Sequence, residues 1–142
     1  MERIAAALDV TMGQVFDGAG PESPLPAVVR AGDRVTLTSE WSKAQIESLA
    51  TAGTGARLEP VLLILAPGGK SGTRPYSSER EEFALILEGT VVLTLKEPGS
   101  GGTPEQEYVL QSGDAVMIRA GVARRWENSS RAPVKVMMVS AR

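Results

Sequence analysis

The 142-residue chain contains no histidine and no cysteine, and these two absences exclude much of the usual chemistry of enzyme sites. Ser-His-Asp triads and Cys-His nucleophile pairs cannot be formed without these residues. Zinc or iron sites built on imidazole or thiolate are excluded as well. The lack of cysteine also excludes disulfides, which suits a reducing compartment. Carboxylates, lysines, arginines and tyrosines remain.

The chain also has little excess of either charge and no long hydrophobic run. The net charge of -2 gives no general reason to bind nucleic acid or a membrane. No apolar run approaches the roughly 20 residues that a membrane-spanning helix needs, and the start, Met1-Glu2-Arg3-Ile4, does not read as a signal peptide. With 42% hydrophobic residues, the chain fits one domain with a real core. We therefore expect a cytoplasmic protein with no membrane partner.

The first 26 residues differ in pattern from the rest. Ile4, Leu8 and Met12 recur at four-residue steps with alanines between them, which predicts a helical segment over residues 1–17. Residues 18–26 are rich in glycine and proline and predict a linker.

From residue 27 to residue 142 the signals are those of β-structure. Short runs rich in β-branched and aliphatic residues alternate with Gly, Pro and Asp turns, and Gly89, Gly113 and Gly121 are candidates for turn glycines. The predicted strands are 35–38, 45–50, 61–65, 83–87, 91–95, 108–110, 115–118, 124–127 and 134–139. The run at 45–50 is the weakest of them, because its helix propensity competes. Many short strands of this kind favour an antiparallel sandwich or barrel.

Three of these runs, 61–65, 83–87 and 134–139, are apolar on both strand faces. A small barrel needs only its inward face to be apolar. The outward face then requires cover from the N-terminal segment or from a second subunit. This pattern predicts a homodimer.

Two spaced motifs identify the kind of barrel. Gly113, Gly121 and Asn128 stand in the frame Gly-x5-[Arg119]-x-Gly-x2-[Arg124]-x3-Asn, and Glu82 is separated by six residues from Gly89. These runs resemble the two cupin signatures, Gly-x5-Pro-x-Gly-x2-His-x3-Asn and Gly-x5-His-x-His-x3,4-Glu-x6-Gly. The resemblance implies an all-β cupin jelly-roll barrel over residues 27–142, preceded by the short N-terminal helical segment.

The resemblance also shows where metal ligands are missing. The histidine pair of the first signature falls on Tyr76 and Ser78, or, in an alternative register, on Pro75 and Ser77. The third histidine falls on Arg124. A permanent cation with no lone pair repels a divalent metal, so we expect no metal and no other cofactor.

An ion pair between Arg124 and Glu82 is the expected replacement for the metal–carboxylate bond. The alternative is that Arg124 points to solvent at the barrel mouth, since buried pairs carry a heavy desolvation cost. Strand alternation puts Trp126 on the same face as Arg124 and Arg125 on the other.

A basic pocket with one indole suits a small carboxylate or phosphate. Arg74 and Arg119 come from the two signature regions and would add positive charge, whereas Arg80 and Arg125 are expected on a solvated rim that balances nearby glutamates. The predicted ligand-binding residues are Tyr76, Ser78, Glu82, Arg119, Arg124 and Trp126. The predicted partners are a small anionic ligand and a second copy of the chain.

Residues 2–16 resemble the last two helices of a lambda-repressor-like (xenobiotic-response-element type) helix-turn-helix domain. In bacterial regulators that domain precedes a linker and a cupin module, and the order here is the same. The helix that would enter the major groove lies upstream in that family and has no counterpart here. The resemblance implies a regulator-like module that does not bind a specific DNA sequence as given.

Three functional hypotheses follow. The first is a non-catalytic cupin module for small-anion sensing and dimerisation, related to cupin-type transcriptional regulators. The second is a metal-independent isomerase or epimerase that acts on a small anionic substrate. A barrel plugged by Trp126 and aliphatic side chains would favour the third, a structural barrel without a ligand.

Overall fold

The computed structural model describes residues 28–50, 56–72, 75–97 and 105–141. This part of the chain is built almost entirely from antiparallel β-strands, as the sequence predicts, with one 3-10 turn, η2, at Ala31–Asp33. It contains no helix long and apolar enough to cross a membrane. The predicted helical segment 1–17 and linker 18–26 lie outside the described residues.

Each predicted strand has a counterpart, including the disputed run at 45–50. The strands are β1 Thr36–Ser39, β2 Ala44–Ser48, β3 Leu58–Leu65, β4 Glu82–Glu88, β5 Thr90–Lys96, β6 Gln106–Gln111, β7 Ala115–Ile118, β8 Ala123–Glu127 and β9 Val134–Ala141. In β2 every second residue is buried, so burial of one face outweighs its helix propensity.

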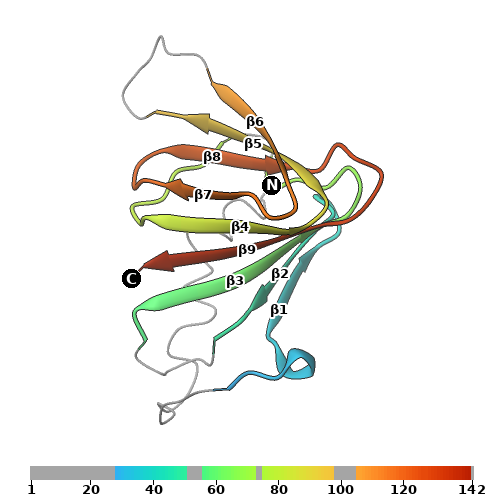
Figure 1. Ribbon diagram of the computed structural model, residues 1–142. Helices are drawn as coiled ribbons and strands as arrows, with labels where there is room; N and C mark the ends of the chain where they lie inside the picture. The colour runs from blue at the N-terminus through green and yellow to red at the C-terminus, as the bar shows by residue number, and fades with distance from the viewer. Residues whose placement is uncertain (1–27, 51–55, 73–74, 98–104, 142) are drawn as a thin grey trace.

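The strands form two sheets that face each other around the core (Figure 1). One sheet has the order β1-β2-β3-β9-β4-β7, and the other has the order β6-β5-β8. Isolated bridges from Lys70 to Glu127 and from Tyr76 to Arg124 add the segment before β4 to the free side of β8. The second signature region and the stretch just before Glu82 are thereby joined.

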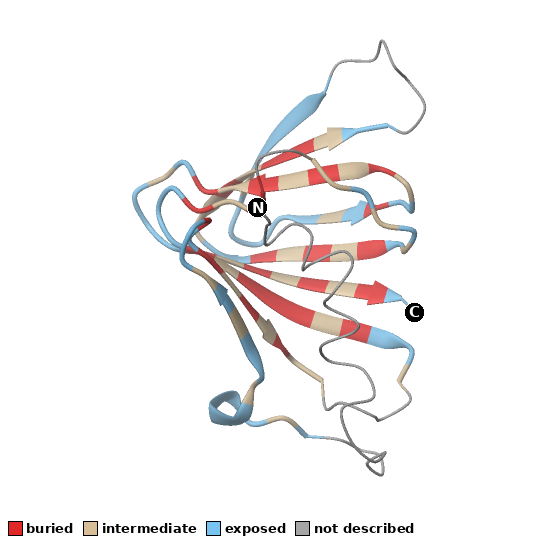
Figure 2. Ribbon diagram, turned by 180° about the vertical axis from the view of Figure 1, so that it is seen from behind, coloured by how far each residue is buried: buried red, intermediate tan, exposed pale blue. Residues whose placement is uncertain are grey.

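The core lies between the two sheets and is filled by the inward residues of each strand. In β9, Val134, Val136 and Met138 are buried while the residues between them are half-buried. Figure 2 shows the same alternation of buried and less buried positions along several strands. Among the described residues, Trp126 is the largest fully buried side chain and packs with aliphatic side chains in this core, the arrangement that the third hypothesis, a structural barrel, expects.

The three strands that are apolar on both faces, β3, β9 and β4, are neighbours in the larger sheet. Their outward side chains lie in register, with Leu62 opposite Met137 and Phe83 opposite Val139. Leu62 is only 7% exposed and the other three are half-buried. The outward face of these strands is therefore already partly covered within one chain.

The predicted turn glycines have the backbone conformation that requires glycine. Gly89, Gly113 and Gly121 have φ values of 87°, 95° and 87°. At these angles a side chain would be strained, which explains why the turns between β4 and β5, β6 and β7, and β7 and β8 carry glycine.

Candidate functional site

Arg124 and Glu82 form an ion pair inside the barrel, as the sequence predicts. Arg124 lies on β8 and Glu82 is the first residue of β4, on the opposite sheet. Nη1 of Arg124 is 3.0 Å from Oε1 of Glu82. The arginine side chain is fully buried and that of the glutamate is 10% exposed, so the pair is largely removed from solvent.

The remaining contacts of the pair hold both side chains in place. Nε and Nη2 of Arg124 donate to the carbonyl oxygen of Val122 at 3.2 and 2.9 Å, and Nη2 also reaches the carbonyl of Arg119 at 3.4 Å. Oε2 of Glu82 accepts a hydrogen bond from the hydroxyl of Ser140 at 3.2 Å. A buried ion pair persists only when its other polar atoms are satisfied in this way.

A second carboxylate lies two strands away from Glu82. Glu59 on β3 pairs with Ser140 on β9, which pairs in turn with Glu82, so the three residues form one row across the sheet. Glu59 is 3% exposed. Its Oε1 is 2.5 Å from Nη1 of Arg80. Two arginine–carboxylate pairs therefore flank Ser140.

Trp126 lies two residues beyond Arg124 on the same face of β8, as alternation predicts. Its backbone nitrogen donates to the hydroxyl of Ser71 at 2.9 Å. The indole Nε1 is buried and has no hydrogen-bond partner. A buried N–H without an acceptor is uncommon and costs stability; among the described residues, the hydroxyl of Ser42 is also buried without a partner.

Tyr76 lies directly opposite Arg124. The two backbones exchange hydrogen bonds of 2.8 and 2.7 Å, and the half-buried Tyr76 packs against the core cluster. Residues directly opposite in an antiparallel pair point to the same face, so the geometry suits the register that aligns Tyr76, and not Pro75, with a ligand position. Ser78 uses its hydroxyl locally, as the acceptor for the backbone nitrogen of Arg80 at 3.1 Å.

The other arginines do not gather around the pair. The side chain of Arg119 is 74% exposed and binds Glu97 at 3.1 Å, so only its backbone carbonyl reaches Arg124. Arg74 lies outside the described residues. Arg125 faces away, donating to the carbonyl of Gly72 at 2.8 Å and pairing with Glu127 at 3.0 Å. Arg80 departs from the expected solvated rim because it binds the buried Glu59.

The residues at the signature positions do not fit a metal ion. Arg124 offers no lone pair, and its guanidinium already holds the one carboxylate of the set. Across the described ranges, no group of three or more His, Cys, Asp or Glu could hold a metal. No metal-dependent step can be derived for this site.

Sequence reasoning did not single out Ser140 or the Glu59–Arg80 pair. The alternation of inward and outward residues along the strands would have placed Ser140 and Glu59 inside the barrel. Glu59 is in phase with the inward Val61 and Leu63, and Ser140 with Val136 and Met138. The contact with Arg80 carried no such signal, because Arg80 precedes β4 in an irregular segment.

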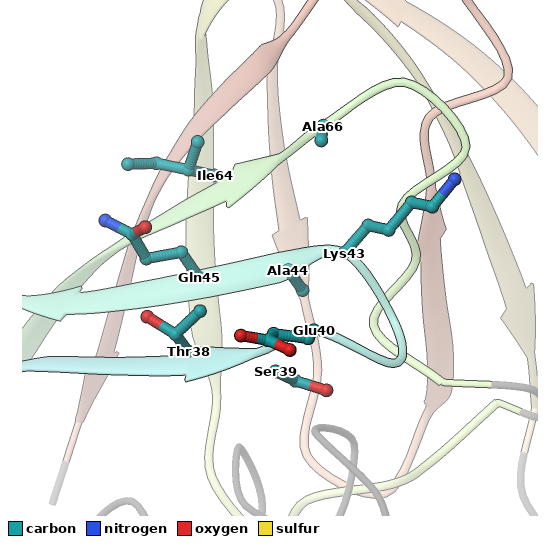
Figure 3. A pocket seen from close by; sticks show the side chains of 8 residues that line it. All are labelled: Thr38, Ser39, Glu40, Lys43, Ala44, Gln45, Ile64 and Ala66. Carbon is teal, nitrogen blue, oxygen red and sulfur yellow. The ribbon is translucent and has the colours of Figure 1, made fainter.

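A pocket of about 360 Å³ lies elsewhere, on the hairpin of β1 and β2 next to the end of β3 (Figure 3). It is lined by Thr38, Ser39, Glu40, Lys43, Ala44, Gln45, Ile64 and Ala66. Figure 3 shows the Lys43 side chain extending away from Glu40, so the two charges do not converge on one point. None of the predicted site residues is among this lining.

Comparison with known proteins supports the fold. The family model described as "Cupin domain" matches residues 61–140. No curated protein sequence matches the chain. A sugar phosphate isomerase from a cupin superfamily of Silicibacter pomeroyi is 24% identical, with a TM-score of 0.65 over 82% of this chain and 76% of that one.

Two further solved structures share the fold at lower identity. The Drosophila melanogaster CENP-C cupin domain is 18% identical, with a TM-score of 0.65 and 92% of each chain covered. Hydroxypropylphosphonic acid epoxidase from S. wedmorenis is 13% identical, with a TM-score of 0.66 over 80% of this chain. The present chain spans only 58% of the length of that epoxidase.

Proposed function

The chain belongs to the cupin domain family, and from this premise we propose that it is a metal-free, non-catalytic cupin module that binds a small anion. The observation that carries the proposal is the Arg124–Glu82 pair. Its two residues align with metal-ligand positions of the cupin signatures and lie 3.0 Å apart inside the barrel. The guanidinium presents N–H donors to the interior where a metal ion would sit, and Glu82 balances its charge.

The balance of donors and acceptors around the pair supports an anionic ligand. Arg124 contributes five N–H donors, and Trp126 adds an indole N–H that has no acceptor. Glu82 is the one carboxylate that contacts the guanidinium, whose other hydrogen bonds go to the carbonyl oxygens of Val122 and Arg119. A carboxylate or phosphate oxygen that reached this interior would give the indole N–H an acceptor and share the guanidinium with Glu82.

Catalysis by an isomerase or epimerase mechanism has less support. A general base needs a free lone pair close to the proton that it removes. Both oxygens of Glu82 already accept hydrogen bonds, one from Arg124 and one from Ser140. A base at this position would have to act while ion-paired with Arg124 and with only 10% of its side chain exposed.

We further propose that the module self-associates and serves a sensing role. The resemblance of residues 2–16 to regulator helices supports the sensing role. Exposed apolar side chains on the strands, such as Val109 and Met117, support self-association. In this proposal ligand binding and self-association are separate properties that can be measured independently.

Tryptophan fluorescence tests anion binding directly. The chain has two tryptophans, of which Trp41 is 63% exposed and Trp126 is fully buried. In a Trp41→Phe variant, emission reports on Trp126 alone. Titration with inorganic phosphate, citrate and a sugar phosphate should give a saturable change for at least one of them. No change with any of the three, and no heat in calorimetry, would contradict the proposal.

A matched pair of variants separates the site from general electrostatics. The double variant Glu82→Gln with Arg124→Met removes both charges and should abolish the response. Arg125→Ala removes one positive charge from the other face of the same strand and should leave the response unchanged. Equal loss in both variants would indicate non-specific attraction of anions.

A further inference from the structure

The outer edge of β6 lies open in the described part of the chain. β6 closes one end of the smaller sheet and pairs only with β5 there. The pairing runs without a bulge from Thr90 opposite Gln111 to Leu95 opposite Gln106. Figure 1 shows β6 at the outer end of its sheet, on the far side of β5 from β8. Backbone N–H and C=O groups along the other side of β6 therefore point away from the sheet.

β6 also lacks the features that usually protect such an edge. Its sequence, Gln-Glu-Tyr-Val-Leu-Gln, contains no lysine, arginine, proline or glycine, and its single charge is Glu107. Five of its six residues are exposed, among them Val109 at 63%. Exposed edge strands without such protection are templates for pairing with another strand.

Tyr108 gives an independent sign that the edge is incomplete. It pairs with Leu93, which is fully buried, so Tyr108 lies on the inward face of the sheet. Tyr108 is nevertheless 43% exposed. An inward aromatic residue stays exposed when no strand follows to cover it.

We propose that a second copy of the chain pairs its β6 antiparallel to this β6, which joins the two three-stranded sheets across a two-fold axis. The inference rests on the proposed self-association and assigns its surface. An open edge is extended by another strand, which continues the ladder of main-chain hydrogen bonds. An identical strand closes the assembly with a single two-fold contact.

Strand geometry then fixes the register. Residues that face each other in an antiparallel pair point to the same side of the sheet. In a two-fold pair of identical strands, one residue must therefore face its own copy across the axis, which passes through the position of that residue. If the axis passes through Val109, it places Glu107 opposite Gln111 of the second copy and Tyr108 opposite its Leu110. An axis through Tyr108 would place Glu107 opposite Val109. The Val109 register keeps the two acidic side chains apart and pairs apolar residues with apolar residues.

The outward face of the larger sheet is the competing surface. Its side chains on β3 and β9 are partly covered, from Leu62 at 7% exposure to Leu58 at 59% at the start of β3. Met117 lies on β7 of the larger sheet, opposite Phe83 of β4, and is 57% exposed. It provides a control position with exposure close to that of Val109.

Light scattering of charge variants at tens of micromolar protein is the first test. The wild-type chain should be a dimer. Val109→Lys would set two like charges against each other on the axis and should give a monomer that keeps the circular dichroism spectrum of the folded chain, because the site is exposed in a single copy. Met117→Lys should remain a dimer.

Disulfide trapping is the second test, and the absence of cysteine from the chain makes it clean. Antiparallel neighbours have Cα atoms at distances that lie within the roughly 4.4–6.8 Å range of disulfides. Val109→Cys should therefore form a cross-linked dimer on mild oxidation, while Met117→Cys should not.

The possible results distinguish the proposed β6 interface from self-association through another surface. A wild-type monomer would overturn both this inference and the self-association on which it rests. A wild-type dimer in which Val109→Lys stays dimeric and Val109→Cys fails to cross-link would overturn the β6 edge alone. Neither result bears on anion binding, which is measured by fluorescence.

Discussion

Arg124 and Glu82, 42 residues apart in the chain, meet inside the barrel with Nη1 and Oε1 3.0 Å apart. The cupin signatures place these two positions around a metal ion, and here a guanidinium and a carboxylate contact each other directly. The pair keeps two halves of the barrel in contact, since Arg124 lies on the smaller sheet and Glu82 on the larger one. It also makes the interior polar without making it a metal site.

Breaking the pair from one side should strongly destabilise the fold. Arg124→Ala leaves the carboxylate of Glu82 buried without its counter-charge, and removing one partner of a buried pair costs about 3–5 kcal/mol. Urea denaturation of Arg124→Ala, Glu82→Gln and the double variant measures the coupling between them. The double variant should be less destabilised than the sum of the single ones, because no lone charge stays buried.

Additivity of these effects within about 0.5 kcal/mol would mean that the two residues do not interact. Arg119→Ala is the control. Its ion pair with Glu97 is exposed on both sides, and an exposed pair contributes little. A large effect of that variant would point to a role for Arg119 that its side-chain contacts do not explain.

The purified protein should carry no stoichiometric transition metal. Imidazole and thiolate are absent from the whole chain, and Arg124 holds the carboxylate that would bind the ion. Elemental analysis after dialysis measures this directly. About one equivalent of zinc, iron, manganese or nickel per chain would contradict the assignment of the site.

The contact between Arg124 and Glu82 was predictable because strand positions have a fixed direction. Arg124 is in phase with Trp126 on β8, and Glu82 opens a strand whose alternate residues are apolar. The same rule would have placed Glu59 and Ser140 inward had it been applied to the ends of β3 and β9. Period-two alternation therefore carries much of the information about which polar residues share the interior.

Side chains outside the strands could not be placed in this way. Arg119 follows the last residue of β7, Ile118, so no alternation fixes its direction, and it turns outward to Glu97. Arg80 precedes β4 and finds a carboxylate 21 positions earlier in the chain. Long flexible side chains at strand ends select partners through the tertiary fold, which a single sequence does not display.

Substituting alanine at Gly113 and at Gly89 compares the cost of backbone strain alone with the cost of backbone strain plus a steric clash. Gly113 has a φ of 95° with open space around the position of a Cβ atom, so Gly113→Ala should cost about 1–2 kcal/mol from strain. At Gly89, with φ 87°, a Cβ atom would lie 2.6 Å from the carbonyl oxygen of Pro133. Gly89→Ala should therefore be more destabilising by at least about 1 kcal/mol. Equal melting temperatures for the two variants would contradict this account of the β4–β5 turn.

Asn128 combines a signature position with a structural role that can be measured. It is fully buried, and its Nδ2 donates to the carbonyls of Leu65 and Ala132 at 3.0 and 2.8 Å. Its Oδ1 accepts from the backbone nitrogen and the hydroxyl of Ser130 at 2.9 and 2.6 Å. The side chain thus ties the end of β3 to the loop between β8 and β9.

Asn128→Ala should lower the free energy of unfolding by about 2–3 kcal/mol, because it leaves a buried carbonyl without a donor. Asn128→Asp should be at least as damaging, since a carboxylate would face two carbonyl oxygens. Ser129→Ala, one residue away and exposed, is the control and should change stability by less than about 0.5 kcal/mol. If Asn128→Ala unfolded at the same urea concentration as the wild type, the hydrogen bonds of Asn128 would not be what holds this end of the barrel together.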